Sequence, residues 1–158
     1  MPVSRPYMFD PPKIGEAIQS YLEDVNIHVD LFQVEWSPYL EKTEGGEHPM
    51  CLLGWTGDNG DPNNFMALYG ANGCGIGTAL NVAFYNNTEV QDKLSAALQT
   101  YDVDERAQLY KEAQVIIHED APFVYLAHAN QNLVFTKNVQ GFVLNPTARY
   151  FFYPVDMT

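Results

Sequence analysis

A chain of 158 residues is long enough to bury a hydrophobic core, and its 46% hydrophobic and 13% aromatic content is typical of a globular protein rather than a disordered one. The net charge of -12, from 20 acidic and 8 basic residues with no Lys/Arg cluster, argues against nucleic acids and anionic membranes as partners. No apolar stretch reaches the roughly 18 to 20 residues that span a bilayer, and the N-terminus lacks the basic and apolar regions of a signal peptide.

Five segments are predicted in the first third of the chain. Four prolines make residues 1–12 extended rather than helical. Residues 14–25 carry apolar side chains at helical spacing, and residues 27–32 alternate like a half-buried strand. Residues 37–44 read as a short helix, and the apolar run 50–53 reads as a buried strand. A strand, a helix and a strand in this order imply a right-handed parallel crossover.

The remainder begins with a predicted long loop over residues 70–87, which hold four glycines and several asparagines. Two amphipathic helices follow, one from Thr88 to about Thr100 and one that begins at Asp102. Four short apolar segments then read as strands: 123–127, 133–135, 141–144 and 150–153.

Capping patterns mark where the helices begin. We expect Asp10 or Pro11 to cap the first helix, and Ser37-Pro38 the second. Asp61-Pro62 predicts a further helix start, with the aspartate as N-cap and the proline in the first helical position. Capping boxes are predicted at Thr88 with Gln91 and at Asp102 with Glu105.

The segment from Gly54 to Pro62, GWTGDNGDP, carries the strongest functional signal. It ends an apolar strand with a carboxylate and starts a helix within four residues. An indole wall from Trp55 beside the carboxylate of Asp58 would suit an ammonium group, through charge pairing and cation–π attraction. The alternative is turn chemistry alone, with Asp58 solvated and Trp55 in the core.

This string closely resembles the signature of the periplasmic dipeptide- and oligopeptide-binding proteins of ABC importers, the solute-binding proteins of family 5. Residues 1–7 resemble that family's segment entering the ligand cleft, and residues 35–48 resemble the helix leading to its signature strand. Residues 106–112, with Ala121-Pro122 beyond them, resemble its late helix and following strand. The resemblance covers nearly the whole chain and points to the dipeptide-binding subgroup.

The resemblance implies an α/β fold, with a mixed sheet flanked by helices, forming part of the C-terminal lobe of a type II periplasmic-binding-protein clamshell. Because members of the family are much longer, residues 1–158 are expected to be a C-terminal fragment. Residues from about 141 to 158 would form a tail returning toward the missing N-terminal lobe. Without that lobe, we expect the aromatic tail to be exposed, covered by a second chain or packed in a non-native way.

The resemblance also implies a site for a zwitterionic dipeptide or short peptide. Asp58 would take the α-ammonium, Arg5 would pair with the α-carboxylate, and Tyr7 would donate a hydrogen bond close by. Trp55 would lie against the ligand or just behind it. Without the resemblance, Arg5 reads as a surface ion-pair residue and Tyr7 as a core or edge aromatic.

The implied function is to bind such peptides in the periplasm, or outside the cell on a membrane anchor, and to deliver them to the permease subunits of an ABC importer. The signal peptide would lie outside this fragment. Two alternatives stay open: a clamshell protein for another solute, such as a sugar or a nickel complex, and a stand-alone interaction or dimerisation module.

Catalytic, cofactor and metal sites are not expected. The sequence has no Gly-x-Ser-x-Gly motif, no phosphate loop and no Gly-x-Gly-x-x-Gly leading into a helix, so a hydrolase is the least favoured function. The four histidines have no paired spacing, and the run from Asp58 to Asp61 lacks the later acidic ligand of a calcium loop.

The two cysteines give no clear redox signal. Cys51 lies in the apolar strand and reads as a small buried hydrophobe, whereas Cys74 lies in the Gly-rich loop. Many relatives close a disulfide across this loop, but the partner position near Asn86 holds no cysteine, so we expect that bond to be lost. A bridge between Cys51 and Cys74 is left as an option.

Overall fold

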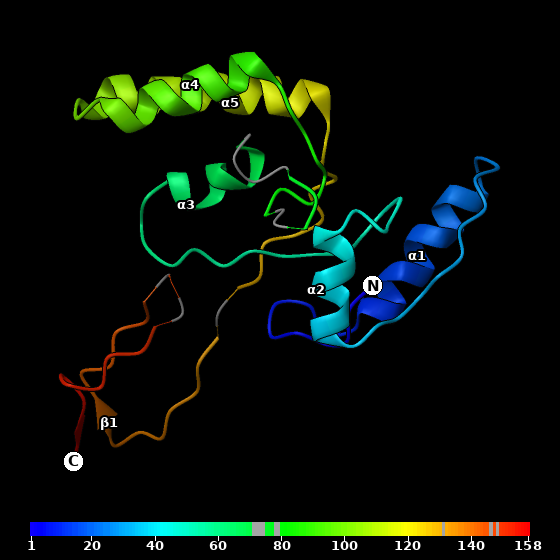
Figure 1. Cartoon of the computed structure of the whole chain (residues 1–158). Helices are drawn as coiled ribbons and strands as arrows, with labels where there is room; N and C mark the ends of the chain where they lie inside the picture. The colour runs from blue at the N-terminus through cyan, green and yellow to red at the C-terminus, as the bar shows by residue number, and fades with distance from the viewer. Residues whose placement is uncertain (71–74, 78–79, 131, 146, 148) are drawn as a thin grey trace.

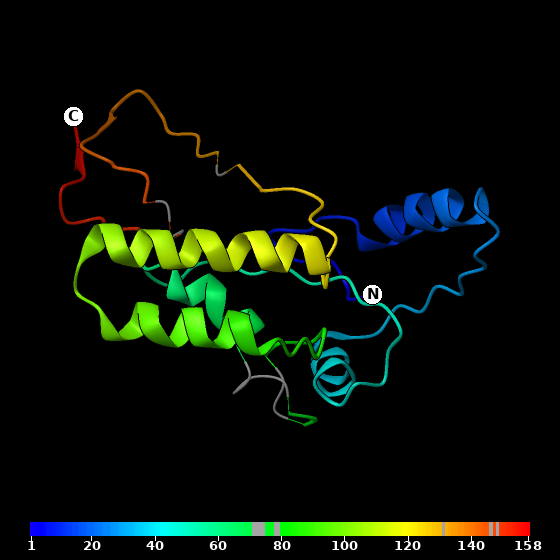
Figure 2. The same ribbon diagram turned by 90° about the horizontal axis from the view of Figure 1, so that it is seen from above.

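The computed structural model of the chain describes residues 1–70, 75–77, 80–130, 132–145, 147 and 149–158. Helices α4 (Thr88–Gln99) and α5 (Val103–Asp120) lie side by side, with α3 (Asn63–Met66) next to them (Figures 1 and 2). Helices α1 (Pro11–Glu23) and α2 (Trp36–Glu44) lie at the other end of the molecule. After α5 the chain runs away from the helices and then folds back, so that Arg149 lies 3.6 Å from Asp58 (Figure 1). The described part of the predicted loop 70–87 contains no helix or strand, and Cys74 lies outside the described residues.

The first two helices begin close to where the sequence predicts. Helix α1 spans Pro11–Glu23, and the side chain of its N-cap Asp10 accepts a hydrogen bond from the Lys13 amide. Helix α2 spans Trp36–Glu44 with Glu35 as its N-cap, so the predicted start at Ser37-Pro38 is two residues late. Pro38 is tolerated there because amides in the first turn of a helix have no intrahelical acceptor.

Helices α4 (Thr88–Gln99) and α5 (Val103–Asp120) form an antiparallel hairpin. The capping box at Asp102 is confirmed on the N-cap side, because its carboxylate accepts a hydrogen bond from the Glu105 amide at 2.9 Å. The predicted cap at Thr88 is wrong: Asn87 is the N-cap, and its side-chain oxygen accepts hydrogen bonds from two amides of the first turn. An asparagine one residue earlier makes the same bonds from outside the helix.

The core lies between this hairpin and the short helices beneath it. The 3-10 helix η1 (Ala67–Tyr69) follows directly after α3 (Asn63–Met66) and adds Tyr69 to the core. Residues one turn apart on the facing sides of α4 and α5 supply the rest, which gives each helix one apolar face. The buried side chains are Tyr69, Val90, Leu94, Ala97, Tyr110, Ala113 and Ile117.

Strands are fewer than the sequence predicts. The described residues contain one antiparallel ladder, β1 (Val139–Gln140) with β2 (Asp156–Met157), and two isolated bridges, a parallel one between Pro2 and Val34 and an antiparallel one between Arg5 and Met8. The predicted strands at 27–32, 50–53, 123–127, 133–135, 141–144 and 150–153 form no ladder there, and the expected parallel crossover is wrong. A strand exists only through hydrogen bonds to a neighbour, and these segments run singly.

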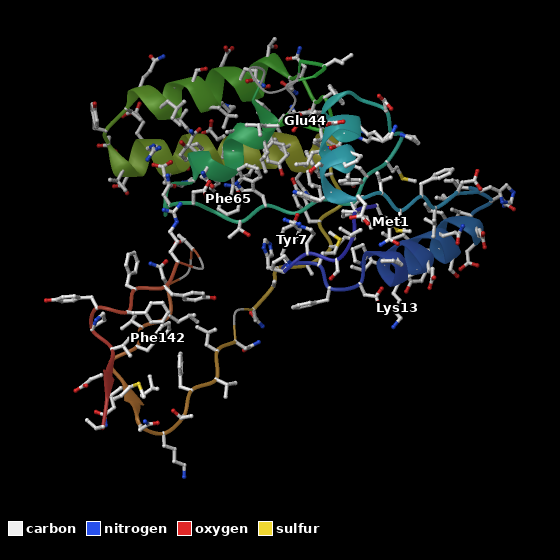
Figure 3. The ribbon with its side chains drawn as sticks, turned by 60° about the horizontal axis from the view of Figure 1, so that its bottom comes forward. Met1, Tyr7, Lys13, Glu44, Phe65 and Phe142 are labelled. Atoms are coloured by element: carbon white, nitrogen blue, oxygen red, sulfur yellow. The ribbon has the colours of Figure 1, made fainter. Side chains whose placement is uncertain are left out.

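The aromatic tail makes its own small cluster. The Phe142 ring lies 4.6 Å from Phe135 and 6.1 Å from both Tyr150 and Phe152, between ring centroids (Figure 3). Phe152 and its neighbour Tyr153 are nevertheless exposed, as expected for this tail in isolation. Among the described residues, no helix combines the length and apolarity needed to cross a membrane.

Candidate functional site

The N-terminal segment packs against the signature segment through Tyr7 and Gly54. A Cβ atom at Gly54 would lie 2.5 Å from Cε2 and 2.6 Å from Cδ2 of the Tyr7 ring, so the close approach requires glycine. A tight turn holds the tyrosine, because Arg5 and Met8 exchange two backbone hydrogen bonds of 2.9 Å. Two segments 47 positions apart in the sequence thereby meet at one place (Figure 3).

Arg5 is held by stacking and not by an ion pair. Its guanidinium carbon lies 3.8 Å from the centroid of the Trp36 ring, and its buried Nε has no hydrogen-bond partner. Among the described residues, no carboxylate comes within ion-pair distance of Arg5, which contradicts its alternative as a surface ion-pair residue. A stacked guanidinium with unused donors is suited to a planar carboxylate.

Trp36, in turn, is connected to the signature segment. Its ring stacks on Tyr39 at 6.2 Å, and the buried Tyr39 hydroxyl donates a hydrogen bond to the Leu52 carbonyl at 2.7 Å. Burial raises the pKa of Tyr39, which keeps this hydroxyl protonated as a donor. Sequence analysis missed the role of Trp36, because the contact with Arg5 joins residues 31 positions apart.

Asn64 organises the loop that carries Trp55 and Asp58. Its side-chain oxygen accepts hydrogen bonds from Trp55 Nε1 at 3.1 Å and from the Asp58 amide at 3.0 Å. Trp55 is 40% exposed, so the alternative that placed it in the core is wrong. Asn64 was not predicted as a site residue; its position two residues after Asp61-Pro62 was the available signal.

The Asp58 carboxylate faces solvent and already attracts a cation. Its Oδ1 lies 3.6 Å from Nη2 of Arg149, and its Oδ2 accepts a 3.5 Å hydrogen bond from Asn64. Both side chains of the ion pair are more than 60% exposed, so the attraction is weak and readily exchanged for another cation. The described residues show no contact between Asp58 and Arg5, and sequence analysis missed Arg149.

Asp61 ties the loop to the helical hairpin. The predicted N-cap at Asp61 is one residue early, because α3 begins at Asn63 with Pro62 as its N-cap and is only four residues long. The Asp61 side chain still accepts a 2.8 Å hydrogen bond from the Asn63 amide. The same carboxylate makes two 2.8 Å hydrogen bonds with Arg106 of α5. These bonds lower the pKa of Asp61, because they favour its charged form.

Cys51 offers no nucleophile. It is a free thiol of intermediate burial, and burial raises its pKa, which suppresses the reactive thiolate. Within the described ranges, no group of three or more His, Cys, Asp or Glu side chains is placed to hold a metal ion.

Known proteins are similar to this chain in sequence and in fold. Residues 3–77 match the family model of the bacterial extracellular solute-binding proteins, family 5 Middle. The chain is 37% identical to a dipeptide-binding protein of Pseudomonas aeruginosa over 156 aligned residues. The alignment covers 98% of this chain and 29% of that protein. It is also 34% identical over 157 residues to heme-binding protein A of Haemophilus influenzae, covering 99% of this chain and 28% of that protein.

A solved structure extends the likeness to three dimensions. The dipeptide-binding protein of a Pseudoalteromonas species, in complex with Met-Leu, superimposes with a TM-score of 0.80 at 28% identity, over 99% of this chain and 31% of that one. This confirms the predicted α/β fold of a clamshell solute-binding protein, of whose length the chain spans less than a third. On these grounds the chain belongs to the bacterial extracellular solute-binding proteins of family 5.

Proposed function

We propose that this protein is a peptide receptor of an ABC importer, which binds dipeptides or short peptides in the periplasm and passes them to the permease. The carrying observation is Arg5, a guanidinium stacked on Trp36 with no carboxylate partner among the described residues. It supplies the cation that a peptide C-terminus needs. The names of relatives that are dipeptide-binding proteins, one of them solved with Met-Leu, support this choice.

Charge pairing at both ends of the ligand would set its length. The α-carboxylate pairs with Arg5, near the Tyr7 hydroxyl, and the α-ammonium replaces the Arg149 guanidinium at Asp58, beside the indole of Trp55. Neither contact touches a ligand side chain, so the site accepts many sequences of one length. A neutral sugar has no charged group that could pair with Arg5 or Asp58.

The proposal also gives residues 1–158 a place in a protein of two lobes. Residues 1–158 form part of the C-terminal lobe, and the tail from about residue 141 to 158 reaches toward an N-terminal lobe that covers its aromatic rings. Closure of the two lobes removes water from both charged ends of the peptide, and the closed form docks on the permease. The protein is a binding protein without catalytic activity.

Calorimetry with the protein as its source genome encodes it, including any codons in frame before Met1, tests the two charge contacts. Arg5→Ala and Asp58→Ala should each weaken Met-Leu binding by about 2 to 5 kcal/mol, because each leaves a ligand charge buried without its partner. Asp92→Ala, which removes an exposed aspartate on α4, should leave the affinity unchanged. Near-normal affinity in either site variant would reject the assignment.

The calorimeter also separates other ligand classes. If the protein binds hemin, a nickel complex or a sugar but not Met-Leu, it is a receptor for that solute and not for peptides. Hemin is included because one relative is a heme-binding protein. The exposed aromatic tail favours one alternative of a different kind, a dimerisation module. A size-exclusion mass that doubles with concentration, together with no solute binding, would support that module.

A further inference from the structure

We propose that Arg106, on α5, is a positioning residue for the ligand-binding loop, acting through Asp61 and Asn64 on Asp58 and Trp55. The inference rests on the proposed function, because it concerns how the candidate ammonium site keeps its shape. Arg106 itself lies behind the loop, where it contacts α4, α5 and Asp61.

The guanidinium of Arg106 is held by four hydrogen bonds. Nη1 and Nη2 donate 2.8 Å hydrogen bonds to the two carboxylate oxygens of Asp61, and Nε donates one of 3.0 Å to the carbonyl of Ala97, near the end of α4. Nη2 also donates to the Tyr110 hydroxyl at 3.1 Å. Because a guanidinium is planar and rigid, these bonds hold Asp61 in one orientation relative to the helical hairpin.

Asp61 passes this constraint to the first turn of α3. Its Oδ1 accepts a 2.8 Å hydrogen bond from the Asn63 amide, and its backbone carbonyl accepts one of 3.1 Å from the Asn64 amide. A helix of four residues cannot hold itself together in water, so its orientation depends on such outside contacts. Besides the packing of Met66 on the core at the other end of α3, Arg106 therefore constrains where the Asn64 backbone lies.

Asn64 completes the connection to the site. Its side-chain oxygen receives hydrogen bonds from Trp55 Nε1 and from the Asp58 amide, and its side-chain nitrogen reaches the Asp58 carboxylate. Moving Asn64 would therefore displace both the indole and the carboxylate expected to meet the ligand ammonium. The carboxylate of Asp58 has no stronger tie among the described residues, since its ion pair with Arg149 is exposed and 3.6 Å long.

A second ion pair in the same hairpin provides a matched control. Lys93 of α4 and Glu112 of α5 form an ion pair of 2.7 Å. Like the Arg106–Asp61 pair, it is partly exposed, but it joins α4 to α5, and among the described residues neither partner bonds to the loop. Lys93→Gln thus reports what loss of a hairpin ion pair does to the fold, without loosening Asp61.

The experiment compares two ligands on the protein encoded in the source genome, with thermal melting to verify that each variant is folded. The readout is the ratio of Kd for N-acetyl-Met-Leu to Kd for Met-Leu, because acetylation removes the charge that Asp58 recognises. Arg106→Gln and Asp61→Asn should each lower this ratio about tenfold, as expected when a supporting contact is lost behind a binding group. Arg106→Lys should recover part of it, and Lys93→Gln should leave it unchanged.

The outcomes separate the two proposals. An unchanged ratio in Arg106→Gln, or an equal loss of affinity for both ligands, would overturn the positioning role while leaving the receptor function intact. A wild-type protein that binds no dipeptide would reject the proposed function. In that case, hydrogen exchange of the Asp58 amide still tests whether Arg106 positions the loop. Faster exchange in Arg106→Gln than in Lys93→Gln supports the positioning role, and equal rates refute it.

Discussion

Substituting alanine for Gly54 probes the contact that joins the N-terminal segment to the signature segment. The new Cβ would lie 2.5 Å from one ring atom of Tyr7 and 2.6 Å from another, whereas ordinary contacts begin at 3.4 Å. The ring must therefore retreat by about 1 Å to restore normal packing. Tyr7 lies within the turn that Arg5 and Met8 close by two backbone hydrogen bonds, so the turn must shift or the ring must leave its rotamer.

Overpacking of this kind costs about 1 to 3 kcal/mol of the free energy of unfolding. In a Tyr7→Ala background the ring is gone, so Gly54→Ala should then cost almost nothing. A double-mutant cycle over Gly54 and Tyr7 should accordingly give a coupling energy of about 1 to 3 kcal/mol. The size of the coupling measures the contact itself, apart from any intrinsic preference of alanine over glycine.

Urea unfolding, followed by tryptophan fluorescence, measures the four proteins of the cycle. Gly60→Ala is the matched control, because a Cβ there meets nothing within 4 Å and the backbone is not left-handed. Its effect should stay within about 0.5 kcal/mol. Equal unfolding free energies for Gly54→Ala and Gly60→Ala, or a coupling near zero, would show that Tyr7 does not pack on the signature segment.

Two further predictions concern the helices and the loop. Asn87→Ala should lower the free energy of unfolding by about 0.5 to 2 kcal/mol, because two amides of α4 lose their acceptor. Thr88→Ala should change it far less. Urea unfolding measures both variants, and a larger loss for Thr88→Ala would show that Thr88 is the cap. The folded-state pKa of Asp61 is lowered below its ordinary 3.8, so the carboxylate stabilises the fold above that pH and the benefit is lost as the pH falls through the folded pKa. Unfolding free energies of wild type and Asp61→Asn should differ by a constant amount between about pH 5 and 7 and converge below 3.8, and a difference that grows toward low pH would contradict this sign.

The helices were predictable because their signals are local. Asp10 and Asp102 accept amide hydrogen bonds from residues three positions later, as capping patterns require. The predicted starts of α2, α3 and α4 were wrong by one or two residues, as at Asn87, which caps α4 in place of its neighbour Thr88. The choice between such neighbours depends on which side chain lies outside the first turn, and spacing alone does not reveal that.

The candidate site was predictable only in part. The sequence singled out Asp58, Trp55, Arg5 and Tyr7, and the resemblance to a known family gave each of them a role. The partners Asn64, Trp36 and Arg149 were missed as site residues, because their contacts depend on how loops and helices meet in space. The roles in ligand binding stay predictions until the affinities are measured.

The sequence by itself determined the helices, the signature turn and the family, since each is encoded by residues close together in the chain. Only the tertiary structure decided that Arg106 clamps Asp61 from 45 positions away and that Tyr7 needs a glycine at position 54. It also decided that, among the described residues, none of the apolar runs predicted as strands pairs into a ladder. Helical hydrogen bonds are made within a segment, whereas a strand or a binding site is completed by distant residues, whose arrival depends on the packing of the whole chain.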